Sequence, residues 1–148
     1  MFDVIVAFVQ QSGWPYEVVE AGSVLRVPLK GENGDWLAVI MADEAFSQCV
    51  VFSYLTQEVP AVRRSAMAEF LTRANYGLRI GDFEMDFDDG EVRFRTSLDT
   101  AEEALSPAML KQLVTHNAMQ MDSYLPGIGA VIRGATPVEA IAMAEDAS

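Results

Sequence analysis

The carboxylates between residues 82 and 91 come closest, in type and spacing, to a chemical site. The run consists of Asp82, Glu84, Asp86, Asp88, Asp89 and Glu91. Clustered carboxylates can bind Ca²⁺ or act as general acids and bases. A calcium loop needs glycine at its sixth position and glutamate at its twelfth, whereas counting from Asp86 puts Gly90 fifth and Ser97 twelfth. We therefore interpret the run as the solvated face of a strand and expect no metal site.

The single histidine and the single cysteine do not compose a site either. His116 shares the polar face of a predicted helix with Gln112 and Gln120, so we expect it to be exposed and to have no catalytic role. Cys49 lies in an apolar run, where a buried thiol behaves as a small hydrophobe. A zinc site would have to recruit carboxylates, and a Cys-His dyad would need a strand and a helix to meet by chance. One cysteine cannot form an intrachain disulfide, which favours a reducing, cytoplasmic setting.

The common signatures of nucleotide binding and acyl transfer are missing from the sequence. It contains no G-x-x-x-x-G-K-[ST], no G-x-G-x-x-G and no G-x-S-x-G. Asn117 is the one polar residue on the apolar stripe of its helix, and a buried amide must find partners, so we expect structural hydrogen bonds to the backbone. We predict neither catalytic residues nor a cofactor, and we class the protein as non-enzymatic.

Composition narrows the possible partners. The 148 residues carry a formal net charge of −12, which repels phosphate backbones and anionic headgroups and so argues against binding to nucleic acid or to a membrane surface. No apolar stretch approaches the roughly 20 residues of a spanning helix, and the N-terminus lacks the positive charge of a signal peptide. The length fits one domain over residues 1–148.

The elements that would position these residues begin with a helix starting near Phe2. Short joins then connect predicted strands at 16–20, 23–29, 35–42 and 46–55, which indicates an antiparallel meander. The strands at 35–42 and 46–55 are apolar at odd and even positions, which is typical of strands covered on both faces. A helix is predicted over 61–75, and Val62 is the first residue of its apolar stripe.

The late part of the chain contains a hairpin and the longest helix. Asp89-Gly90 is a favoured two-residue turn, and pairing outward from it sets Phe87 opposite Val92, Met85 opposite Phe94, Phe83 opposite Thr96, Asp86 opposite Arg93 and Glu84 opposite Arg95. Ser106-Pro107 predicts the start of the longest helix and Pro126-Gly127 its end. Thr136 and Glu139 form a capping box that opens a last short helix.

Two segments carry a family resemblance. The first runs A-N-Y-G-L-R-I-G-D-F-E from Ala74 to Glu84, with Asp89-Gly90 and the R-T-S-L-D of residues 95–99. The second is N-A-M-Q-M-D-S-Y-L-P-G from Asn117 to Gly127. With the order of elements they resemble the YbjN domain, a putative bacterial sensory transduction regulator with a type III secretion chaperone-like fold. The resemblance implies a small acidic homodimer that binds segments of other proteins, and it implies no catalytic residues.

We therefore predict an α+β fold in which one twisted antiparallel sheet of five or six strands packs against helices, chiefly the first and the last, in the order α-β(3-4)-α-β-β-α. We expect a protein-binding module, chaperone-like or regulatory, that acts as a homodimer on an apolar or basic segment of another protein. A small-ligand sensor is the alternative, followed by an unrecognised enzyme. The candidate dimer or protein-binding surface is centred on Trp36, Ile40, Phe52 and Tyr54, because a second subunit would cover the apolar strands.

Overall fold

The computed structural model describes residues 1–146. Its elements in chain order are α1 (Phe2–Gln11), β1 (Glu17–Glu20), β2 (Val24–Lys30), β3 (Asp35–Asp43), β4 (Gln48–Tyr54), the 3-10 helix η1 (Ala61–Arg63), α2 (Arg64–Gly77), β5 (Asp82–Met85), β6 (Val92–Asp99), α3 (Pro107–Ile132) and α4 (Pro137–Asp146). The predicted α+β class and order of elements are confirmed, with α4 as the short last helix. Two predicted caps are also present, because the side chains of Ser106 and Thr136 accept hydrogen bonds from the amides of Met109 and Glu139.

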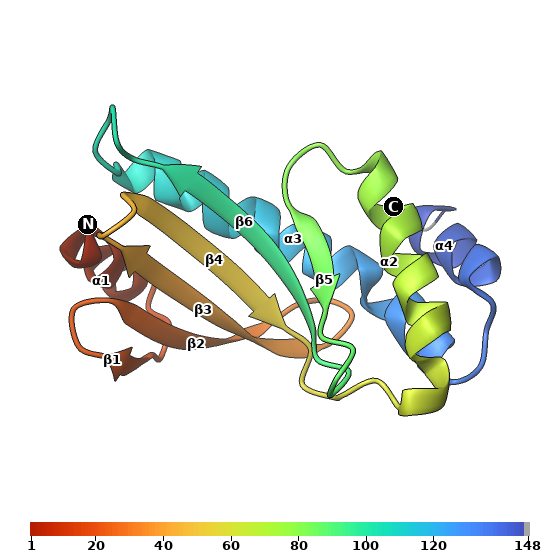
Figure 1. Cartoon of the computed structure of the whole chain (residues 1–148). Coiled ribbons are helices and arrows are strands. Elements are labelled where there is room, and N and C mark those ends of the chain that lie inside the picture. The colour runs from red at the N-terminus through yellow and green to blue at the C-terminus, as the bar shows by residue number, and fades with distance from the viewer. Residues whose placement is uncertain (147–148) are drawn as a thin grey trace.

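The six strands form one antiparallel sheet in the order β1-β2-β3-β4-β6-β5 (Figure 1). The first four strands are the predicted meander. After α2 the chain returns, and β6 pairs with β4 while β5 takes the edge. Asn75 of α2 closes part of that edge, since its side chain donates to the carbonyl of Phe83 at 3.0 Å and accepts from the amide of Phe83 at 2.7 Å.

The register predicted for the β5–β6 hairpin is wrong by two residues. Phe83 pairs with Phe94 and Met85 with Val92, so Glu84 lies opposite Arg93 and not Arg95. The turn is longer than two residues, because the amide of Gly90 donates to the carbonyl of Asp86 and the residues between them form the loop. A shift of two residues keeps every side chain on its predicted face. Phe83 is accordingly buried, whereas Phe87 lies in the loop and is exposed.

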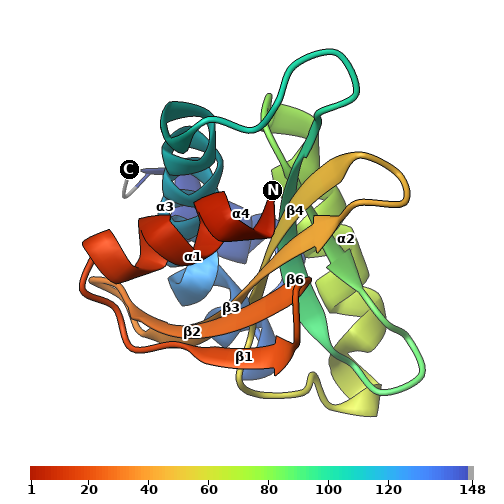
Figure 2. The same ribbon diagram turned by 90° about the vertical axis from the view of Figure 1, so that its left-hand side faces the viewer.

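Helices α1 and α3 pack on the same face of the sheet (Figure 2). Helix α2 contacts α4, α3 and β5, so it lies beside the β5 end of the sheet and does not cover β3 and β4. The predicted helix over 61–75 starts with a 3-10 turn that changes its phase, and Val62, predicted on the apolar stripe, is 87% exposed. The other apolar residues of that stripe are buried or partly buried.

Proline 126 does not end the longest helix, contrary to the prediction. Helix α3 continues to Ile132 because the carbonyl of Asp122, which a proline amide cannot satisfy, accepts a hydrogen bond from Asn33 Nδ2 at 3.1 Å. The Asp122 carboxylate accepts two more, from the amides of Glu32 at 3.1 Å and Asn33 at 2.8 Å. The β2–β3 loop is therefore held against α3 at the proline.

The apolar core forms two clusters on the helix side of the sheet. One lies beneath α1 and the first half of α3 and contains Ile5, Val9 and Ile40. The other joins α2, α4 and the second half of α3 to β5 and β6, and Phe83 stacks edge-on against both Phe94 and Tyr124. Leu29 packs against both clusters.

The buried amide of Asn117 behaves as predicted. Its Nδ2 donates to the carbonyl of Val51 at 2.9 Å and to that of Phe94 at 3.1 Å, while its Oδ1 accepts from the Ser53 hydroxyl. Asn117 is wholly buried, so these bonds replace the water that the amide loses. They connect the middle of α3 to the neighbouring strands β4 and β6.

Candidate functional site

The two faces of the sheet differ in what covers them. Along β3 the even-numbered residues are buried against the helices and the odd-numbered residues are less buried, and the register places Phe52 of β4 beside Val39 on the second face. No helix of residues 1–146 lies across the middle of that second face, which we call the uncovered face. The prediction that β3 and β4 are covered on both faces is therefore wrong for one copy of the chain.

The four residues proposed from sequence fall on opposite faces. Trp36 and Ile40 are 3% and 1% exposed and belong to the two core clusters, so neither can be the centre of a surface in the folded chain. Phe52 and Tyr54 are partly exposed on the uncovered face. Sequence alone could not separate these pairs, because both strands are apolar at odd and even positions.

Apolar side chains form a continuous strip across β3 and β4 on the uncovered face. We call Leu37, Val39, Met41, Val50, Phe52 and Tyr54 the uncovered strip. The rings of Phe52 and Tyr54 are 5.8 Å apart, and the guanidinium of Arg93 lies 4.3 Å from the centre of the Phe52 ring. Leu37 is exposed, Val50 is buried and the other four are partly buried, so the strip is a half-covered apolar surface. Exposed apolar surface of this kind can mark an interaction site.

One end of the uncovered strip is hollowed. The hollow has a volume of about 420 Å³ and is lined by Arg26, Leu37, Val39, Tyr54, Leu55, Thr56, Glu58 and Glu91. Apolar side chains line it together with Arg26 and two carboxylates. A hollow of this kind can receive an apolar side chain of a partner and place a basic group beside Glu58 or Glu91.

The basic residues around the uncovered strip are paired with carboxylates. Arg93 Nε lies 2.7 Å from Glu84, and Arg95 lies within 3.5 Å of both Asp82 and Glu84. Burial opposes the charge of Arg93, but hydrogen bonds to Tyr54 and Glu84 outweigh it, so the pKa of Arg93 is raised and its charge persists. Arg26 is bonded to Glu17 in the same way. The face consequently offers no free positive patch to an anion.

The side chains that could carry catalysis or a metal are scattered. His116 is exposed, as predicted, and Cys49 is buried, which raises the pKa of its thiol to about 11 and keeps it protonated. Within residues 1–146, no group of three or more His, Cys, Asp and Glu side chains could hold a metal ion. In the same part of the chain, no helix is both long enough and apolar enough to cross a membrane.

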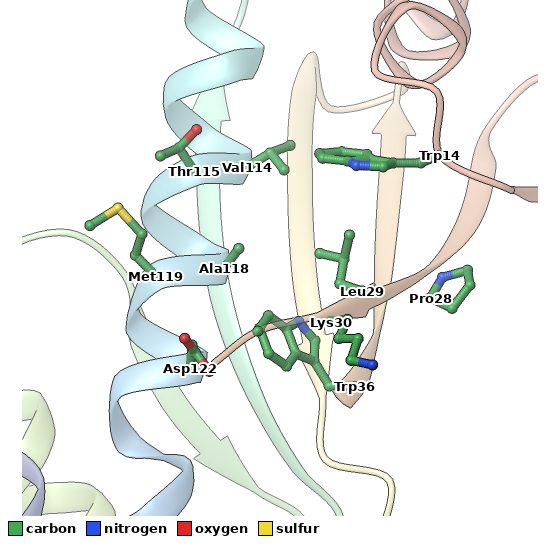
Figure 3. Close-up of a pocket in the computed structure, with 11 residues that line it drawn as sticks. Trp14, Pro28, Leu29, Lys30, Trp36, Val114, Thr115, Ala118, Met119 and Asp122 are labelled. Carbon is green, nitrogen blue, oxygen red and sulfur yellow. The ribbon is translucent and has the colours of Figure 1, made fainter. Parts of the chain in front are cut away.

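A pocket that the sequence analysis did not find lies on the helix side, between α3 and the end of β2 (Figure 3). We call it the tryptophan pocket. Its volume is about 490 Å³, and it is lined by Trp14, Pro28, Leu29, Lys30, Gly31, Trp36, Val114, Thr115, Ala118, Met119 and Asp122. The one sequence signal was Trp14, an aromatic residue in the Gly13-Trp14-Pro15 turn after α1. Its ring packs edge-on against Phe8 at 5.7 Å.

These features define the class of the protein: an α+β domain with one antiparallel sheet, helices on one face and an apolar strip on the other. The YbjN family, described as a putative bacterial sensory transduction regulator, matches residues 2–130. The chain belongs to this family, as the residues of the hairpin and of α3 predicted. No curated protein matches the sequence.

Solved structures show the same fold. YbjN from E. coli, a putative transcription regulator, superposes with a TM-score of 0.61 at 16% identity, over 89% of this chain and 88% of its own. A chain of the HopA1–SchA chaperone–effector complex superposes with a TM-score of 0.51 at 15% identity, over 81% of this chain and 88% of its own. A chain of the ExsC–ExsE complex superposes with a TM-score of 0.53 at 9% identity, over 82% of this chain and 88% of its own. The predicted chaperone-like fold is confirmed.

Proposed function

We propose that this protein is a non-enzymatic protein-binding module, chaperone-like or regulatory, that acts in the cytoplasm as a homodimer on a segment of another protein. The observation that carries the proposal is the uncovered strip. It leaves partly exposed the two central strands, β3 and β4, whose other face is packed against helices. Burying such a surface is worth roughly 25 cal/mol per Å² of apolar area, which is the main source of free energy for association.

The chemistry of the face indicates an apolar segment with basic residues at its flanks. The strip provides apolar contact, while Glu58 and Glu91 line the hollow at its end. The formal net charge of −12 attracts a basic partner and repels an acidic one. The fold supports a role of this kind, since one structural neighbour comes from a chaperone–effector complex.

Homodimer formation is the second part of the proposal. Because Trp36 and Ile40 are buried in the core, we exclude them from the proposed interface. We centre the interface on Phe52 and Tyr54, with Leu37 beside them. A specific interface buries roughly 1,200 to 2,000 Å² in total. Sedimentation at micromolar concentration should show a dimer that dissociates on dilution, whereas a monomer at every concentration would refute this part.

Photo-crosslinking tests which molecule occupies the uncovered strip. A benzophenone amino acid replaces Phe52 in one variant and Gln112, an exposed residue of α3, in the matched control. After irradiation in cells, crosslinks from position 52 to a second copy identify the strip as the dimer face, and crosslinks to another protein identify it as the segment-binding face. Equal crosslinking from both positions, or none from position 52, would overturn the proposal.

A specific observation also favours the second candidate function, a small-ligand sensor. The tryptophan pocket is of the size that small-molecule sites have in proteins, roughly 300 to 1,000 Å³. Because it lies on the helix side of the sheet, a ligand there would leave the uncovered strip free for a partner. The two functions are therefore compatible in one domain.

A further inference from the structure

We propose that the tryptophan pocket binds a small neutral molecule with an apolar, ring-sized body and one hydrogen-bond acceptor. The acceptor would be received by the indole N–H of Trp36. This inference does not depend on the proposed protein-binding function, because it uses residues on the helix side of the sheet and no residue of the uncovered strip.

The unpaired indole N–H of Trp36 points to a ligand with an acceptor. The residue is 3% exposed, and its Nε1 has no hydrogen-bond partner. A buried donor without a partner is costly, and buried tryptophans usually find one. In Figure 3 the nitrogen lies on the ring edge that is turned toward Leu29, whose side chain is partly buried at the pocket wall. The proposal requires Leu29 to move aside, so that a ligand reaches this donor.

The walls of the pocket determine the body of the ligand. Trp14 from the turn after α1 and Trp36 from β3 lie on one side of the pocket, and Val114 and Ala118 of α3 point toward them (Figure 3). Met119 of α3 also belongs to the lining. Met119 is 63% exposed although it is apolar, and it lies at the pocket. Aromatic and thioether surfaces favour a flat, polarisable molecule, which stacks on or against an indole ring.

The charges around the pocket favour a neutral ligand over an anion. Asp122 lies in the lining, and its carboxylate is already bonded to the amides of Glu32 and Asn33. It therefore retains its negative charge but does not offer its best acceptor positions to a ligand. Lys30, the other charged residue of the lining, offsets the charge of Asp122, so the lining has no net charge and favours a neutral molecule. The net charge of −12 on the whole chain further disfavours an anion.

The wall of the pocket that the β2–β3 loop provides is fixed before any ligand binds. A Cβ at Gly31 would lie 2.3 Å from Asp122 Oδ1 and 2.8 Å from the Trp36 ring, so the loop, the carboxylate and the indole are in close contact. The hydrogen bonds of Asp122 fix the same loop to α3. A pre-formed site loses little conformational entropy when it binds.

The experiment uses two probes of nearly the same shape. Acetophenone carries a carbonyl acceptor, and α-methylstyrene replaces that carbonyl with a methylidene group. Both tryptophans of the chain line the pocket. The two indole N–H signals in a ¹H–¹⁵N spectrum of the full chain therefore report directly on binding.

We expect acetophenone to shift the Trp36 indole N–H signal downfield in a saturable titration. It should bind about tenfold more tightly than α-methylstyrene, since it satisfies a buried donor. In Trp36→Phe the N–H is lost while an aromatic ring remains, so the two probes should bind equally. Unsaturable shifts, equal affinities for the unmodified chain, or an undiminished preference in Trp36→Phe would overturn the proposal.

A second pair of variants distinguishes the pocket from nonspecific binding. Ala118→Leu fills the space between the indole rings and should abolish binding of both probes. Ala108→Leu, an equal change at an exposed position in the first turn of the same helix, should leave binding unchanged. Binding that survives Ala118→Leu would place the probes elsewhere and refute the site.

Discussion

The covered and uncovered faces of the sheet are built from alternate residues of the same strands, yet they have different properties. Val51 points toward the helices and is 1% exposed, whereas its neighbour Phe52 points the other way and is only partly buried. The covered face also contains the hydrogen bonds of Asn117, and the uncovered face has ion pairs around an apolar strip. The first face holds the domain together, and the second is available for association.

The difference shows that an apolar strand pattern does not by itself identify a core. β3 and β4 have apolar side chains on both faces, but α1 and α3 can cover only one. The predictions below test this division, from the largest expected effect to the smallest.

Removing the buried amide of the covered face should have the largest effect. Asn117→Leu leaves the Ser53 hydroxyl and the carbonyls of Val51 and Phe94 without their partner. We expect the free energy of unfolding to fall by about 3 kcal/mol, measured by denaturant titration. Gln112→Leu, at an exposed position of the same helix, should change it by less than about 0.5 kcal/mol. Similar values for the two variants would contradict the assignment of Asn117 to the core.

The buried thiol on the covered face should make stability depend on alkaline pH. Burial raises the pKa of Cys49 from its ordinary 9.0 to about 11 in the folded chain. The unfolded chain therefore releases the proton first, so the contribution is fully present below pH 9 and is lost as the pH rises toward 11. The loss approaches about 2.7 kcal/mol, at about 1.36 kcal/mol per pKa unit.

Comparison with Cys49→Ala isolates this effect, because lysines and tyrosines also titrate in the same range. The difference in unfolding free energy between the natural chain and Cys49→Ala should shrink between pH 8 and pH 11. A difference that stays constant would show that the thiol is not buried as described.

Adjacent residues of β4 provide the most direct comparison of the two faces. Val51→Ala should cost the isolated monomer about 2 kcal/mol, since a fully buried side chain is truncated. Phe52→Ala removes more atoms but should cost the monomer about 1 kcal/mol or less, and should instead weaken association. Unfolding at high dilution and sedimentation at micromolar concentration separate the two effects. The comparison fails if Phe52→Ala destabilises the monomer more than Val51→Ala does.

The ion pairs of the uncovered face should contribute least to stability. Glu84→Gln removes the partner that Arg93 and Arg95 share, and we expect a loss of roughly 0 to 1 kcal/mol that diminishes with added salt. A loss well above about 1 kcal/mol, or one that added salt does not reduce, would contradict the description of these pairs as partly exposed. Denaturant titrations at low and high ionic strength provide the measurement.

Added Ca²⁺ or Zn²⁺ should leave the melting temperature unchanged. In the β5–β6 hairpin, Asp82 and Glu84 pair with arginines. Asp86 and Asp89 accept hydrogen bonds from backbone amides of the hairpin loop. A ligand at 100 times its dissociation constant would add about 2.7 kcal/mol, which a thermal melt detects. A clear rise with either ion would refute the prediction.

The sequence by itself determined the local structure. Caps at Ser106 and Thr136, the turn signals between strands and the helical spacing of apolar residues set the elements to within a few residues, because these signals act over short distances. The alternation of side chains also fixed the faces of the β5–β6 hairpin. The register failed because Asp89-Gly90 belongs to a longer loop, which the dipeptide does not reveal.

Only the tertiary structure decided which apolar residues form a surface. Trp36 and Ile40 belong to the core while Phe52 and Tyr54 do not, because α3 lies on one face and α2 packs beside β5. The continuation of α3 through Pro126 depended on Asn33, which approaches from a distant loop to satisfy the free carbonyl of Asp122. The tryptophan pocket likewise joins residues from three separate segments. Such contacts between residues far apart in the chain leave no local pattern, so the sequence could not have predicted them.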